Sequence, residues 1–184
     1  ALTDEIRLHI ESISYGHRFL GIIDLIKAKA LFSMRFEAQL PEMDGHGTME
    51  WLGAVNPVLK QALDKQQKQI VPLTIRMDGH ERILLISGPN AGGKSVCLQT
   101  VGLLQYMFQC GLPIPVLEGS KTMVFKDIFI DIGDEQSIED DLSTYSPHLR
   151  SMDFLIKNAG KGTLFLIDEF GSGTDPQFGG AIAE

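Results

Sequence analysis

Cysteines, long apolar runs and positive charges are scarce in this sequence, and each scarcity excludes a class of protein. Two cysteines among 184 residues are too few for a disulfide-stapled secreted domain, which favours a reducing compartment. No apolar run approaches the roughly 18 residues of a membrane span. Lysine and arginine number 16 against 24 aspartates and glutamates, a net charge of −8, which disfavours nucleic-acid binding by this chain alone. We expect a cytoplasmic protein without a membrane segment.

The content of 43% hydrophobic and 22% charged residues is that of a globular protein, and the length suits one domain with an appendage. The appendage is expected in residues 1–45. No proline occurs from Leu2 to Glu37, and mostly apolar residues recur there at three- and four-residue steps, which predicts one or two helices. Gly16 or Gly21 could mark a bend. Whether this segment protrudes or packs on the core stays open on pattern alone.

From residue 46 onward, short apolar runs separated by glycine, proline and asparagine predict alternating strands and helices, an α/β class. Strands at 70–75 and 82–86 flank Asp78-Gly79, which suggests an antiparallel hairpin. A helix should run from Lys94 to about Gln109 and end at Gly111. Further along, we expect a strand at 125–132, a helix at 145–158 that ends near Gly160, and a fully buried strand at 163–167.

One glycine-rich segment matches a phosphate-binding loop, G-x-x-x-x-G-K-[ST], and reads Gly88-Pro89-Asn90-Ala91-Gly92-Gly93-Lys94-Ser95. The glycines allow backbone amides to turn inward around phosphate oxygens, and the following helix points its positive end at the same place. Lys94 can reach the β- and γ-phosphates and Ser95 can bind Mg²⁺, and we assign all residues from Gly88 to Val96 to nucleotide binding. The alternative is a glycine-rich turn without a ligand, although the apolar run at 82–86 supplies the expected preceding strand.

A second chemical element follows the strand predicted at 163–167, where Asp168 and Glu169 come in succession. The carboxyl ends of strands in a parallel sheet are where ligands bind. Asp168 would hold Mg²⁺ through water, and Glu169 would activate the water that attacks the γ-phosphate. Adjacent acids after a strand can also be a solvated loop. Together with the glycine-rich loop they predict binding and hydrolysis of ATP.

The chain resembles the ATPase domain of the MutS family, most closely its endonuclease MutS-two branch. Four blocks carry the resemblance: the loop from Gly88 to Ser95, Asp127-Ile128-Phe129 with Asp131-Ile132-Gly133-Asp134-Glu135-Gln136-Ser137, Leu142-Ser143-Thr144-Tyr145-Ser146, and Asp168-Glu169-Phe170-Gly171-Ser172-Gly173-Thr174-Asp175-Pro176. The resemblance implies a P-loop ATPase of ABC type in residues 46–184, with an incomplete sheet and with residues 1–45 as the end of a long helical arm. It also implies a truncated fragment of a longer protein.

In such proteins ATP lies between two facing ATPase domains, so the resemblance implies a homodimer in the parent protein. It places Ser143 on the γ-phosphate of the partner's nucleotide, and Ile70 and Val71 beside the adenine. It also implies that nucleotide state controls the dimer and its grip on DNA, branched or mismatched, or on another large nucleic-acid assembly, through regions outside this chain. The alternatives are a nucleotide-binding fragment without turnover and a P-loop phosphotransferase that acts on a small molecule.

Overall fold

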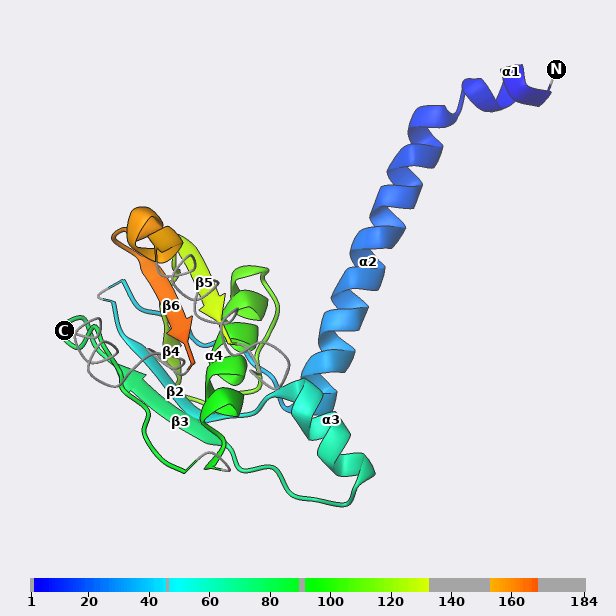
Figure 1. Ribbon diagram of the computed structural model, residues 1–184. Coiled ribbons are helices and arrows are strands. Elements are labelled where there is room, and N and C mark those ends of the chain that lie inside the picture. The colour runs from blue at the N-terminus through cyan, green and yellow to red at the C-terminus, as the bar shows by residue number, and fades with distance from the viewer. Residues whose placement is uncertain (1, 46, 90–91, 133–152, 169–184) are drawn as a thin grey trace, which may run out of the picture.

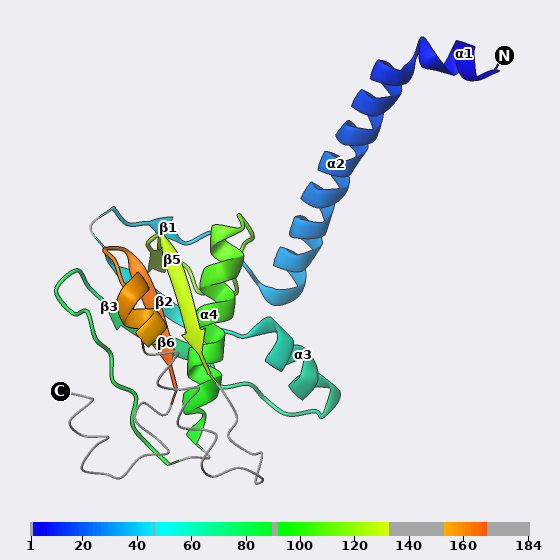
Figure 2. The ribbon, with the colours of Figure 1, turned by 45° about the horizontal axis from the view of Figure 1, so that its top comes forward.

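The computed structural model describes residues 2–45, 47–89, 92–132 and 153–168. It shows an α/β body made of two small sheets with a helix between them, and a long helix that leaves the body (Figure 1). The amino terminus lies at the far end of this long helix in both ribbon views (Figures 1 and 2). The predicted α/β class is therefore what the described residues form.

Two helices make up the amino-terminal segment, as predicted. Helix α1 spans Leu2–Arg7 and α2 spans Ile10–Phe36. The break falls between them, where His9 N donates to Ile6 O over 2.9 Å in a tight turn, and α2 continues through both glycines that could have marked a bend. It ends before Pro41, because Glu37 adopts a left-handed conformation with φ of 52°.

Helix α2 has no buried side chain. Large apolar residues along it are exposed, among them Ile13, Leu20 and Ile26. Both ribbon views show that only its carboxyl-terminal end lies beside the body (Figures 1 and 2). We call α1 and α2 together the arm.

The larger sheet has the strand order β1-β4-β2-β3. Its strands are β1 (Glu42–Met43), β2 (Met49–Ala54), β3 (Leu73–Met77) and β4 (Lys121–Thr122). Strand β2 pairs antiparallel with β3 and with β4, whereas β1 runs parallel to β4. Helix α3 (Pro57–Lys65) separates β2 from β3, and Asn56 caps its amino end through hydrogen bonds of 3.0 and 3.1 Å from the amides of Val58 and Leu59.

The hairpin predicted between residues 70–75 and 82–86 is wrong. Strand β3 pairs with β2, where Ile75 lies opposite Trp51 and both side chains are buried. The expected turn does form, since Asp78 Oδ1 accepts hydrogen bonds from the amides of His80 and Glu81 at 2.9 and 3.2 Å. After the turn the chain continues without a strand at 82–86. Pairing with β2 wins because it brings two large apolar side chains into the core.

The smaller sheet is a parallel pair, β5 (Asp127–Asp131) and β6 (Thr163–Ile167), in the positions predicted for two of the strands. Burial alternates along β6, with Leu164 and Leu166 buried and their neighbours half-buried, so the prediction of a fully buried strand is wrong. Residues 153–158 are helical, and this helix ends before Gly160. The remainder of the helix predicted at 145–158 lies outside the described residues.

Helix α4 spans Lys94–Gln109, the predicted bounds, and it supplies the centre of the core. Its predicted end is confirmed, because Gly111 has φ of 72°, its amide donates to Phe108 O at 2.8 Å, and Leu112 N donates to Met107 O at 3.0 Å. These two bonds satisfy carbonyls that a helix end leaves free. The fully buried Trp51 and Leu104 belong to the core around α4. Strand side chains of both sheets therefore share one hydrophobic cluster.

Candidate nucleotide-binding site

The glycine-rich loop leads directly into α4. Gly93 is the residue that precedes the helix, with φ of 82°, a conformation that favours glycine. Gly92 N donates to Pro89 O at 2.8 Å, which makes a tight turn just before it. Asn90 and Ala91 lie outside the described residues. The described part of the loop therefore turns tightly just before α4.

The amino end of α4 offers backbone amides to a ligand. The first helical hydrogen bond runs from Cys97 N to Gly93 O at 2.9 Å, so the amides of Lys94, Ser95 and Val96 come before the helical ladder begins. Together with the helix dipole, such amides attract phosphate. This is the electrostatic basis of the candidate site.

Lys94 turns its side chain back over the loop. Its Nζ donates a hydrogen bond of 2.7 Å to Gly88 O, the first residue of the motif. The ammonium group therefore lies beside the first residue of the glycine-rich segment.

Asp168 follows the last residue of β6 and is half-buried. Its amide donates to Asp131 O at 2.9 Å, which extends the β5–β6 ladder by one residue. Both ribbon views show the carboxyl ends of β5 and β6 at the same end of the body as the start of α4 (Figures 1 and 2). The fold thus brings the end of β6, which Asp168 follows, and the start of α4 to one end of the body, as expected for strands and helices that alternate.

Alternation along β6 also indicates the side on which Asp168 lies. A methyl group placed on Gly102 of α4 would lie 3.0 Å from Leu166 Cδ1, so Leu166 faces α4. Asp168 is two residues further, one residue past the end of β6, and the two-residue period of the strand predicts that it shares this face. Ser95 and Asp168 would supply a hydroxyl and a carboxylate oxygen, the donors that Mg²⁺ prefers. In the described part of the chain, no group of three or more potential ligand side chains forms a separate metal site.

Four further residues were predicted to belong to the site: Glu169, Ser143, Ile70 and Val71. Glu169 and Ser143 lie outside the described residues. Ile70 is half-buried and Val71 is 88% exposed in the segment that leads into β3. The roles given to these four residues remain predictions.

The strand predicted before the loop does not form. Ile83 and Leu85 are 89% and 87% exposed, although the sequence suggested a buried strand at 82–86. Among the described strands, β2 pairs with β3 and β5 pairs with β6. The apolar run at residues 82–86 takes part in neither pairing.

Two residues close in sequence to the glycine-rich loop have shifted pKa values. Burial raises the pKa of the Cys97 thiol, which sits in the first turn of α4. Backbone hydrogen bonds from His80 and Glu81 lower the pKa of Asp78, which is half-buried. Both shifts follow from local packing and turn geometry, so neither marks a catalytic group.

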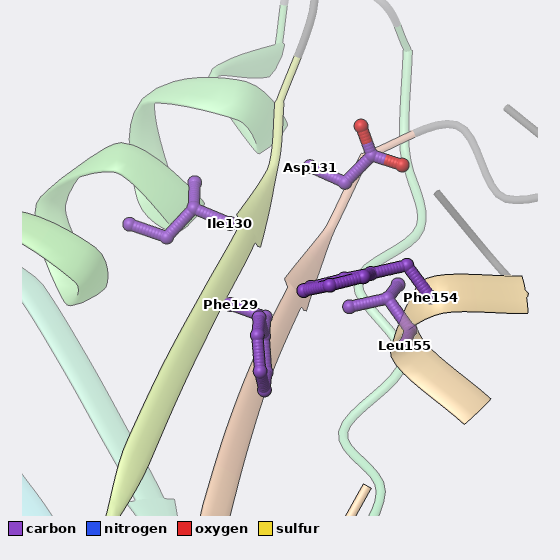
Figure 3. A pocket seen from close by; sticks show the side chains of 5 residues that line it. All are labelled: Phe129, Ile130, Asp131, Phe154 and Leu155. Carbon is purple, nitrogen blue, oxygen red and sulfur yellow. The ribbon is translucent and has the colours of Figure 1, made fainter. Parts of the chain in front are cut away.

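A hollow of about 150 Å³ lies on the other face of the β5–β6 pair, lined by Phe129, Ile130, Asp131, Phe154 and Leu155. Figure 3 shows the rings of Phe129 and Phe154 at this hollow, whereas the Ile130 side chain points the opposite way, towards a helix. Phe129 also stacks on Phe165, with ring centroids 5.4 Å apart. The sequence did not predict this hollow, because Phe154 comes from a separate helix at residues 153–158. It is separate from the glycine-rich loop.

No helix in the described ranges combines the length and the apolar character that crossing a membrane requires.

Comparisons with known proteins agree on one family. The model of MutS domain V matches residues 84–184. The chain is 43% identical over 177 residues to a protein named Endonuclease MutS2 from Lactobacillus helveticus (strain DPC 4571), covering 96% of this chain and 22% of that protein. It is 42% identical over 182 residues to a protein of the same name from Bacillus velezensis, covering 99% of this chain and 22% of that protein. The chain spans about a fifth of the length of these curated relatives.

Proposed function

The chain belongs to the MutS family, and on that premise we propose that it carries the ATP-binding and ATP-hydrolysing site of a larger DNA-binding protein. The observation that carries this proposal is the return of Lys94 Nζ to Gly88 O at the amino end of α4. We further propose that residues 46–184 are the first part of a P-loop ATPase of ABC type, with residues 1–45 as a helical arm. A cytoplasmic location belongs to the same proposal and rests on composition.

Binding would begin with the triphosphate at the start of α4. Phosphate oxygens would accept hydrogen bonds from the loop amides and from those of Lys94, Ser95 and Val96. The Lys94 ammonium would exchange Gly88 O for the β- and γ-phosphates, since an anion is a stronger acceptor than a carbonyl. Such a site selects for a polyphosphate and makes few contacts with the base. We assign the contacts with the base to Ile70 and Val71.

Hydrolysis would need the acidic pair. Mg²⁺, when bound, neutralises phosphate charge, and Ser95 and Asp168 are the residues that would hold it. Glu169 would orient the attacking water and accept its proton. In the parent protein, Ser143 of a second copy would contact the γ-phosphate and so make a homodimer depend on ATP. The grip of that dimer on DNA would then follow the nucleotide state.

Replacement of Lys94 tests the proposal at its strongest point. Lys94→Ala should weaken binding of ATP with Mg²⁺ by at least about a hundredfold, which corresponds to about 2.8 kcal/mol. The measurement is a calorimetric titration, and Lys161→Ala is the matched control because Lys161 is an exposed lysine in the turn before β6. Equal affinity in wild type and Lys94→Ala would contradict the proposed site.

Replacement of Glu169 separates turnover from binding. Glu169→Gln should keep the affinity for ATP and lose most of the phosphate release, because the amide cannot accept a proton. Glu118→Gln, an exposed site in a turn, is the control. Tight binding without phosphate release in the wild type as well would favour a nucleotide-binding fragment without turnover.

A further inference from the structure

Positive charge is concentrated in two stretches of the chain, residues 25–36 at the end of α2 and residues 57–72, which contain α3. Together they hold six lysines and arginines and one acidic residue, a net charge of +5. The whole chain has a net charge of −8, so the remaining residues carry −13, the difference between −8 and +5. We call the two stretches the basic region; its positive residues are Lys27, Lys29, Arg35, Lys60, Lys65 and Lys68.

The fold brings the two stretches together beside the loop that follows α4. Just after α2, Gln39 exchanges two backbone hydrogen bonds of 2.9 Å with Ile114. Just before α3, the amide of Val55 donates to Pro115 O at 2.9 Å. Both ribbon views show α3 beside the carboxyl-terminal end of α2 (Figures 1 and 2). Positive residues that are far apart in the sequence therefore share the place where the arm joins the body.

The end of α3 presents two lysines to a partner. Lys65 and Lys68 are exposed, and no described acidic side chain forms an ion pair with either of them. The chain turns sharply after α3, because the amide of Lys68 donates to Leu63 O at 3.0 Å and Gln67 adopts a left-handed conformation with φ of 55°. This turn keeps the backbone of Lys68 beside the last turn of the helix that ends with Lys65.

Three other members of the basic region have partners within the chain. Lys60 Nζ lies 3.8 Å from Asp64 Oδ1, and Lys29 Nζ donates to a backbone carbonyl at 2.8 Å. The guanidinium of Arg35 lies over an aromatic ring of its own helix. These side chains keep their positive charge and add to the local potential, whereas Lys65 and Lys68 can contact an anion directly.

The composition around these two lysines indicates a phosphate backbone as the partner. Lysine and glutamine are among the residues that bind phosphate and sugar oxygens in protein–DNA complexes. Aromatic side chains, on which the bases of single strands stack, do not occur in residues 57–72. The pattern therefore fits the backbone of a duplex better than a single strand. The glutamines that accompany the lysines are all exposed: Gln61, Gln66, Gln67 and Gln69.

We propose that the basic region contacts the sugar–phosphate backbone of double-stranded DNA, with Lys65 and Lys68 as direct phosphate contacts. The inference rests on the proposed function only in that the parent protein holds DNA, and it needs no nucleotide at the glycine-rich loop. Because the remaining residues carry −13, they repel the duplex. The contact is accordingly local and weak, and it sets how the junction of arm and body lies against DNA that other regions of the parent hold.

The test measures binding of the 184-residue chain to a fluorescent DNA duplex by anisotropy, without nucleotide and over a range of salt concentrations. The logarithm of the binding constant should fall with the logarithm of the salt concentration, with a slope of about −0.9 for each phosphate contacted. The double variant Lys65→Gln with Lys68→Gln should reduce the magnitude of this slope by about 2 and weaken binding at least about tenfold at low salt.

Two further double variants separate position from net charge. Lys126→Gln with Lys161→Gln removes the same number of charges from exposed sites directly before β5 and β6, and it should leave the affinity within about twofold of the parent. Lys65→Arg with Lys68→Arg should bind as the parent does, because the contact needs charge and not a particular cation. Circular dichroism establishes that each variant is folded.

Lysine reactivity locates the contact in the wild-type chain. At saturating duplex, acetylation of Lys65 and Lys68 should slow several-fold, while Lys126 and Lys161 should react as they do in free protein. Mass spectrometry of the digested protein reads each lysine separately. Protection of all four lysines to the same degree would contradict a contact at the basic region.

The remaining outcomes each decide one part of the inference. No binding at the lowest salt concentration, or equal loss in the two glutamine double variants, would overturn the contact at the basic region. Tighter binding of the single strand, or of an RNA duplex of the same sequence, would overturn the assignment to double-stranded DNA. ATP takes no part in these measurements, so the Lys94→Ala titration judges the proposed nucleotide site separately.

Discussion

Helices α2 and α4 are similarly apolar on average, yet α2 is exposed along its length and α4 lies in the core. The 27 residues of α2 include no buried side chain, whereas α4 buries six of its 16 residues. The difference lies in the surroundings. Both sheets turn apolar side chains towards α4, while only the last turns of α2 lie beside the body. Apolar periodicity thus predicts a helix in both cases, but it does not tell which helix is in the core.

The two helices should also differ in what they contribute to stability. Burying a leucine contributes about 1.5 to 3 kcal/mol relative to leaving it exposed. The exposed leucines and isoleucines of α2 contribute little of this to the body. If the comparison holds, equal substitutions in the two helices will have unequal effects on the free energy of unfolding.

The largest expected difference is between two leucines. Leu104→Ala should lower the free energy of unfolding by about 2 to 5 kcal/mol, because Leu104 is 0% exposed and its removal leaves a cavity. Leu20→Ala should change it by no more than about 0.5 kcal/mol, since Leu20 is 66% exposed. Urea unfolding followed by tryptophan fluorescence measures both, because the single tryptophan, Trp51, is fully buried beside α4. Equal losses would mean that the arm packs more than the structure shows.

The next largest difference in stability is expected between substitutions of two glutamines of α4, Gln105 and Gln99. Gln105→Met should cost about 1 to 3 kcal/mol, because Met123 O loses its donor and the Thr122 hydroxyl loses its acceptor. Gln99→Met, on the exposed side of the same helix, should stay within about 0.5 kcal/mol. The same unfolding experiment checks both. A neutral Gln105→Met would show that apolar packing alone fixes α4.

Much of α4 and the parallel pair could be predicted from the sequence. Lys94 and Gln109 bound α4 as expected, because a glycine-rich start and Gly111 at the end are local signals. Strand β6 was also predicted with its bounds, since a short β-favouring run between glycine and acidic residues has few alternatives. Local chemistry was sufficient for these elements.

The pairing of strands that lie far apart in the sequence could not be predicted. Residues 82–86 have the sequence pattern of a strand, but a strand needs a partner to pair with. The predicted partner, β3, pairs with β2 instead, although α3 separates β2 from β3 in the sequence. At the candidate site, Lys94 and Asp168 could be named from their motifs, and the fold brings their elements to one end of the body. The hollow beside Phe129 was missed because it depends on Phe154, which comes from a separate helix. One sequence contains no information on such contacts.

The smallest expected effects come from two glycines, and they should have opposite signs. Gly102→Ala should lower stability by about 1 kcal/mol, because its methyl group would lie 3.0 Å from both Ile130 Cδ1 and Leu166 Cδ1, on two different strands. The cost of overpacking, about 1 to 3 kcal/mol, then exceeds the helix propensity gained, about 1 kcal/mol. Gly21→Ala meets nothing within 4 Å, so the gain in propensity stands alone.

That gain is local to the arm, so the measurement must be local too. Amide hydrogen exchange around Gly21 should slow about fivefold in Gly21→Ala, as expected for up to about 1 kcal/mol of added helix stability. The urea midpoint of the body should stay unchanged, because α2 buries no side chain there. If Gly21→Ala instead shifted the midpoint, the arm and the body would unfold as one cooperative unit. The contrast between α2 and α4 would then describe their contacts and not their stability.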